Sequence, residues 1–289
     1  MEILTKRLAY IDAMRGFTMI LVVFSHVQYF GYGEFIQSVY NFCGGGSCLI
    51  YRDLITLFFM PLFFFISGFV LYKPDVEWNG IMSFKFIAKK ALQLLVPTLV
   101  FISLYIFVYN SPLNLLCRSG RLGYWFTIAL FEYYLLYTLF RWICYRLHRH
   151  EGTDWLLLSG SAILYFAVTQ SVLNRLGVNN ETISLLGLDQ LRFFFYFAIG
   201  SLVRKHFSWF KELLENGKII TLLIIAFFSL FLIVHRSGFT FGNAMMYHLY
   251  NFIGGLMALF IVLIFFYKYQ YVFENTCNCL LYTSDAADE

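Results

Sequence analysis

Two ionisable side chains, Arg15 and His26, lie in one apolar segment near the N-terminus, with ten residues between them. If this segment is helical, eleven steps of about 100° bring both side chains to one face, about 16 Å apart along the axis. A guanidinium can hold phosphate or carbonyl oxygens through paired hydrogen bonds, and an imidazole can exchange a proton near neutral pH. Ionisable groups are costly in hydrocarbon and usually face a bundle interior or a water-filled cavity, so the pair predicts a site.

Each residue also has a plainer interpretation. Arg15 can be the positive flank of a membrane span, and His26 can be a hydrogen-bonded packing residue. Asp12 lies one turn before Arg15, where it either caps the helix or pairs with the guanidinium. Glu132 falls inside the apolar run LFEYYLL, where an unpaired carboxylate is costly, so we expect it to meet an arginine, a histidine or a water cavity.

Composition sets the class of protein. The chain has 289 residues, of which 60% are hydrophobic and 13% charged, and its mean hydropathy is +0.69. Soluble domains average about a quarter charged residues, so the sequence predicts an all-α, polytopic transmembrane helix bundle. The net charge of +4 is spread over loops, which argues against a nucleic-acid partner. The six cysteines lack zinc-ligand spacing, so no metal site is expected.

The apolar segments predict about eight spans in this chain. They are expected at residues 14–32, 52–72, 88–109, 122–145, 155–173, 190–205, 217–235 and 246–268. With these spans, fourteen Lys and Arg residues fall on the side of the N-terminus and six on the other side, which places the N-terminus in the cytoplasm. Arg15 is then near the cytoplasmic face and His26 toward the outer half.

The domain prediction is a single membrane domain at 1–268, followed by a tail at 269–289. The last ten residues, LLYTSDAADE, are polar and acidic after a phenylalanine-rich chain. They resemble the conceptual translation of a sequencing adapter, so we expect a non-native tail and a domain incomplete at its C-terminus. In the first outer loop, Cys43 and Cys48 either form a disulfide or remain as two thiols.

The N-terminal segment resembles the integral-membrane acyltransferase family 3. The matching residues are Asp12-Ala-Met-Arg15-Gly16 with His26, and the block Phe-x-x-Ser-Gly-Phe from Phe64 to Phe69. Weaker matches are Tyr124-Trp125-Phe126 and the run from Phe195 to Gly200. Where many relatives carry arginines before the third span, this chain has Lys90 and Gln93, which weakens the transfer of a phosphate-binding role to that place.

The resemblance implies an inner-membrane enzyme of about ten spans that moves an acyl group, here expected to be acetyl, from acyl-CoA to a hydroxyl of an envelope carbohydrate or lipid-linked glycan. His26 would act as general base or take the acyl group covalently. Arg15 would orient the donor. The expected catalytic residues are His26, Arg15 and Glu132, and the expected substrate-binding residues are Asp12, Ser67, Lys90 and Trp125. Among the latter, Ser67 also has a packing interpretation and Trp125 that of an interface anchor.

Two other functions fit the same residues. In a secondary transporter or flippase for an envelope precursor, Arg15, Glu132 and His26 would form a proton or anion pathway. The absence of an evident internal repeat argues modestly against the transporter folds built from duplicated halves. A non-catalytic subunit of a polysaccharide machine is the third reading, and the ionisable residues within the membrane disfavour it. The acceptor, the acyl chain and the oligomeric state do not follow from the sequence.

Overall fold

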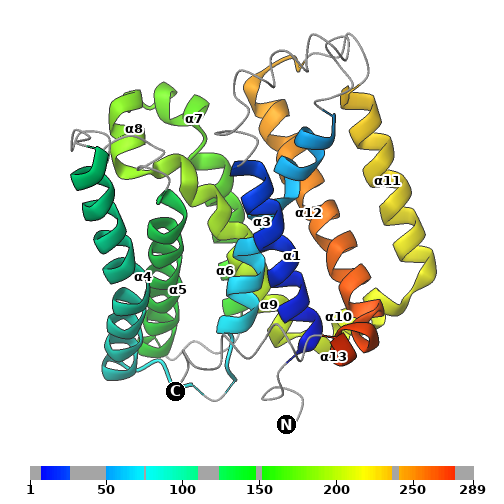
Figure 1. Ribbon diagram of the computed structural model, residues 1–289, viewed down its shortest axis with the longest axis horizontal. Helices are drawn as coiled ribbons and strands as arrows, with labels where there is room; N and C mark the ends of the chain where they lie inside the picture. The colour runs from blue at the N-terminus through cyan, green and yellow to red at the C-terminus, as the bar shows by residue number, and fades with distance from the viewer. Residues whose placement is uncertain are drawn as a thin grey trace. The chain divides into compact units, whose positions relative to one another are not determined.

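A computed structural model describes residues 8–26, 50–74, 76–109, 124–147, 152–235 and 241–276. Every regular element within these ranges is a helix, as Figure 1 shows. The all-α prediction is therefore confirmed for the described part of the chain. The loop with Cys43 and Cys48 and the terminal segment LLYTSDAADE lie outside it.

The chain divides into two compact units, one made of residues 1–67 and 203–289 and the other of residues 68–202. The division falls within two helices, α3 and α9. The first unit contains α1 (Ala9–His26), most of α3 (Ile50–Leu71), α10 (Phe207–Glu215), α11 (Gly217–His235), α12 (Ala244–Lys268) and α13 (Gln270–Thr276).

Apolar side chains hold the first unit together. Leu57 of α3, Phe227 and Phe231 of α11 and Ala258 of α12 form one buried cluster. α12 approaches α3 closely, because a Cβ added at Gly254 would lie 3.0 Å from a Leu57 methyl carbon. In Figure 1, α12 (orange) runs beside α11 (yellow) and α1 (blue), and α1 also contacts α13.

The second unit is built around a pair of long helices. It contains α4 (Gly80–Tyr109), α5 (Trp125–Arg146), α6 (Thr153–Ala167), α7 (Gln170–Arg175), α8 (Asn180–Leu186), the 3-10 helix η5 (Leu188–Phe193) and most of α9 (Phe194–Lys205). α4 and α5 lie side by side in Figure 1. The hydroxyls of Thr98 on α4 and Thr127 on α5 are 2.9 Å apart.

Aromatic rings fill the core of the second unit. The ring of Phe197 on α9 lies 5.4 Å from Tyr134 and 6.0 Å from both Tyr133 and Tyr137 of α5. A Cβ added at Gly68, in the last turn of α3, would lie 1.9 Å from the carbonyl oxygen of Phe197. Only glycine therefore allows the backbones of α3 and α9 to approach this closely.

Four helices of the described chain are long and apolar enough to cross a membrane, namely α3, α4, α11 and α12. Each of the eight predicted spans overlaps a described helix, although residues 27–32 of the first and 122–123 of the fourth lie outside the described ranges, and the fifth and sixth each comprise two elements. Residues 155–173 correspond to α6 and part of α7, and residues 190–205 to part of η5 and α9. The chain is a multi-pass membrane protein, and the count of about eight spans stays a prediction.

Candidate functional site

Arg15 and His26 lie on one continuous helix, α1 (Ala9–His26). Regular helix geometry therefore brings their Cα atoms to one face, about 16 Å apart along the axis. Arg15 lies two turns into the helix and His26 is its last residue. The side chain of His26 is outside the described side chains, so its contacts stay a prediction.

Arg15 pairs with Asp12. Its Nη1 atom is 3.5 Å from Oδ1 of Asp12, and the side chains are 49% and 11% exposed respectively. Because α1 begins at Ala9, Asp12 lies inside the first turn rather than at the N-cap position. Of the two roles expected for Asp12, helix capping and pairing with Arg15, the structure contains the pairing. The Asp12 carboxylate contacts one side of the Arg15 guanidinium, and the Arg15 side chain is half exposed.

The surface around Arg15 is open on one side and packed on the other. Tyr10 and Met14 are buried, and the ring of Tyr10 lies 5.6 Å from that of Tyr267 on α12. By contrast, no described atom lies within 4 Å of a Cβ built at Gly16. The small residue beside Arg15 thus leaves room for a ligand group to approach the guanidinium.

A second cation lies in the same unit. Arg204 on α9 is only 7% exposed, and its charge lies within electrostatic reach of the Tyr10 hydroxyl on α1. In the count of positive residues by membrane side, Arg204 is one of the fourteen on the side of the N-terminus. Its burial near Tyr10 places a second guanidinium inside the unit that carries Arg15.

The Ser67-Gly68 dipeptide has mainly a packing role. The Ser67 hydroxyl donates to the carbonyl oxygen of Phe63, one turn earlier, at 3.0 Å. Gly68 allows the close contact with Phe197 described above. A role of Ser67 in substrate binding therefore stays a prediction. Its hydroxyl proton is already donated to a carbonyl oxygen of its own helix.

Lys90 of α4, expected to assist an anionic donor, lies over two aromatic rings. Its Nζ is 4.9 Å from the ring centroid of Tyr134 and 5.9 Å from that of Phe86. These cation–π contacts hold the ammonium against the α4–α5 pair. Its binding of donor phosphate stays a prediction.

Glu132 belongs to a polar cluster in the second unit, formed by α5 and η5. One of its carboxylate oxygens is buried. The neighbouring Tyr133 hydroxyl donates a hydrogen bond to the carbonyl oxygen of Gln190 and lies within electrostatic reach of Glu132, Asp189 and Arg192. The expectation that Glu132 meets an arginine, a histidine or a water cavity stays a prediction, and Arg192 lies within electrostatic reach of Tyr133, the next residue along α5.

Aromatic rings border the α5–η5 cluster. Trp125 at the start of α5 lies 6.3 Å from the ring of Phe193, with the planes tilted by 33°. The guanidinium carbon of Arg192 lies 4.9 Å from the centre of the same Phe193 ring. Trp125, the first residue of α5, therefore packs against another ring of the protein.

Sequence reasoning missed Tyr133 and Gln190 as members of this cluster. Tyr133 is fully buried and Gln190 is 5% exposed. The available signal was the polar run Asp189-Gln190-Leu191-Arg192, which interrupts apolar sequence just before α9. Such a run in a membrane domain indicates an internal polar contact, because its groups require partners away from water.

The described residues contain no cluster of side chains that could bind a metal ion. In these ranges, no group of three or more His, Cys, Asp and Glu side chains is arranged to hold a metal ion. The charged groups that the structure describes are suited to binding anions and moving protons. These groups are Asp12 with Arg15, Arg204, and the α5–η5 cluster.

The apolar helices and the charged residues placed among them define a multi-pass membrane protein with a polar site, and the family follows from a direct comparison. A family model described as an acyltransferase domain, that of acyltransferase family 3, matches residues 8–283. The chain therefore belongs to the integral-membrane acyltransferase family 3, as its N-terminal motif predicted. No curated protein and no solved structure matches the chain.

Proposed function

We propose that the protein is an inner-membrane O-acyltransferase that moves an acyl group, most simply acetyl, from acyl-CoA to a hydroxyl of a cell-envelope carbohydrate or lipid-linked glycan. The observation that carries this proposal is the Arg15–Asp12 pair on α1, which also carries His26, in a chain of the acyltransferase family. The proposal includes the predicted topology of about eight spans with the N-terminus in the cytoplasm.

In the proposed reaction, the acceptor hydroxyl attacks the thioester carbonyl carbon while the neutral imidazole of His26 takes the hydroxyl proton. The carbon–sulfur bond then breaks, and the CoA thiolate leaves and is protonated. In the covalent variant, His26 first takes the acyl group and then passes it to the acceptor, which gives ping-pong kinetics. Two-substrate initial-rate patterns distinguish these routes.

Arg15 is assigned to the donor. Its guanidinium is half exposed and held from one side by Asp12 at 3.5 Å, so it can present its remaining N–H groups to phosphate or carbonyl oxygens. Arg15→Lys replaces this planar fork by a point charge. We expect a rise of about tenfold in the KM for acyl-CoA, with a smaller change in the KM for the acceptor.

The rival function, transport of an envelope precursor, is not favoured by the family. Membranes containing the protein, incubated with acetyl-CoA labelled in the acetyl group, distinguish the two. The proposal predicts transfer of label to glycan or lipid-linked glycan. Uptake that depends on a proton gradient and proceeds without transfer of label would support the transporter instead.

A further inference from the structure

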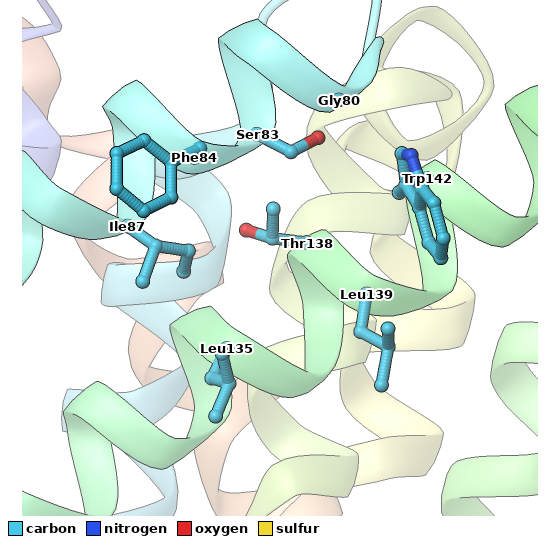
Figure 2. Close-up of a pocket in the computed structure, with 8 residues that line it drawn as sticks. All are labelled: Gly80, Ser83, Phe84, Ile87, Leu135, Thr138, Leu139 and Trp142. Carbon is cyan, nitrogen blue, oxygen red and sulfur yellow. The ribbon is translucent and has the colours of Figure 1, made fainter.

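A groove lies between α4 and α5 in the second unit. Its volume is about 310 Å³, and its lining is apolar except for two hydroxyls and the indole N–H of Trp142. The lining residues are Gly80, Ser83, Phe84, Ile87, Leu135, Thr138, Leu139 and Trp142. Figure 2 shows Gly80 and Trp142 toward one end of the groove and Ile87 and Leu135 toward the other, with Ser83 and Thr138 between them. Sites of this size with a few polar groups in an apolar wall are typical of small-ligand binding.

The two hydroxyls are the unusual feature of this groove. Ser83 is 9% and Thr138 3% exposed. Neither hydroxyl oxygen has a hydrogen-bond partner among the described residues. By contrast, the hydroxyls of Ser67, Thr98 and Ser103 each donate to a carbonyl one turn earlier in their own helix. A buried hydroxyl without a partner is costly, so Ser83 and Thr138 are suited to donate to a ligand acceptor.

The position of the groove along α4 indicates the head-group level of the membrane. α4 has 30 residues, about 45 Å of helix, whereas the hydrocarbon core is about 30 Å thick. Lys85, Lys89 and Lys90 lie in its first part, and a stretch without charged residues follows them. The first turns, which contain Gly80 and Ser83, therefore lie near the head groups, where the ester carbonyls of phospholipids are found.

The groove also adjoins an exposed apolar surface and lies near a cation. Phe84 is 75% and Ile81 70% exposed, so this face of α4 presents apolar side chains beside the groove. Arg146 lies one helical turn beyond Trp142 on α5, on the same side of the helix, and its side chain is exposed. A ligand with an apolar chain, an acceptor oxygen and an anionic group matches these features in the same order.

We propose that this groove binds one phospholipid of the bilayer. One acyl chain lies along Phe84, Ile87 and Leu135, and its ester carbonyl accepts hydrogen bonds from Ser83 and Thr138. The phosphate lies beside Arg146. This binding is independent of the acyl-transfer reaction and of the residues assigned to it.

Quenching of Trp142 fluorescence tests the proposal. Detergent-purified protein is titrated with phosphatidylcholine brominated near the head-group end of its acyl chains, and the signal of Trp142→Phe is subtracted to isolate Trp142. We expect saturable quenching at low lipid ratio. The Ser83→Ala/Thr138→Val variant should weaken the apparent affinity roughly tenfold, since two hydrogen bonds are lost. Arg146→Gln should weaken it about threefold.

Two matched controls lie on α4 outside the groove. Lys85→Gln removes a charge from the opposite side of the helix, and Ser103→Ala removes a hydroxyl that already has a partner in its own helix. Both should bind as the unaltered protein does. Quenching that rises in proportion to the lipid mole fraction, equal in all variants, would overturn the proposal. If the double variant does not fold, Arg146→Gln decides alone, because its exposed side chain is not needed for packing.

Discussion

Replacement of Gly68 by alanine should strongly destabilise the protein. The added Cβ would lie 1.9 Å from the carbonyl oxygen and 2.8 Å from the carbonyl carbon of Phe197. These are backbone atoms, so no side-chain rotation relieves the overlap and α3 must move away from α9. Overpacking of a tight contact costs about 1–3 kcal/mol, and a backbone obstacle belongs at the upper end, about 3 kcal/mol.

The matched control is Gly160→Ala on α6 of the same unit. No described atom lies within 4 Å of a Cβ built at Gly160, so the substitution adds no overlap. It also gains helix propensity, up to about 1 kcal/mol. The chemical change is identical in the two variants, and only the space available to the new methyl group differs.

Thermal unfolding of the detergent-purified variants measures the difference. A loss of about 3 kcal/mol should lower the midpoint of Gly68→Ala by about 6–10 °C, whereas Gly160→Ala should unfold at the original temperature or slightly above it. Because α3 carries the Ser67-Gly68 block, acyl transfer should fall in parallel with the folded fraction. Equal midpoints for the two variants would refute the close approach of α3 and α9 and the packing role of Gly68.

Two further predictions concern charged residues. His235 on α11 donates toward Asp53 on α3, with Nε2 3.4 Å from Oδ2, and its Nδ1 lies 2.9 Å from the Phe231 carbonyl oxygen. Since Asp53 is 40% exposed, Asp53→Ala should lower the free energy of unfolding by less than about 1 kcal/mol. A double-mutant cycle with His235→Ala should show a coupling free energy between the two side chains. Additive effects of the two substitutions would contradict the pair. Glu132→Gln should lower kcat at least about tenfold without changing the unfolding midpoint. The control, Glu77→Gln at an exposed position, should leave both quantities unchanged. A Glu132→Gln variant with full activity would remove Glu132 from the catalytic residues.

The long apolar helices could be predicted from the sequence because hydropathy over about 20 residues reports membrane spans directly. α3, α11 and α12 begin and end within two residues of the predicted limits. α4 begins eight residues before its predicted start at residue 88. There, the Asn79 side chain accepts from the Met82 backbone N–H at 2.9 Å and caps a helix whose first turns mix apolar residues with Ser83 and Lys85.

The short elements of the second unit could not be predicted in this way. Between α6 and α9 the chain forms α7, α8 and η5, of six or seven residues each, which are too short for a periodic pattern. Gly177 and Gly187 adopt positive φ values of 82° and 62° and end two of these turns. The Tyr133–Gln190 contact joins residues 57 positions apart, and such pairings depend on tertiary packing rather than on local pattern.

The candidate site was predicted in part. Arg15, His26 and Asp12 follow from spacing on one helix, because helix geometry relates sequence separation to position. The burial of Arg204 could not be predicted from the sequence. A count of positive residues by membrane side assigns each residue to one face of the membrane and contains no information on packing. The contact of α12 with α1 and the position of Arg204 near Tyr10 are set by tertiary structure.

The most direct test of the account is acyl transfer by purified protein in liposomes, with label in the acetyl group of acetyl-CoA and a glycan acceptor, compared with His26→Ala. A general base typically contributes a factor of about 10²–10⁴, so we expect transfer by the variant to fall at least a hundredfold, with membrane insertion and unfolding midpoint unchanged. Transfer by His26→Ala at the original rate would contradict the assignment of His26 as the reaction centre.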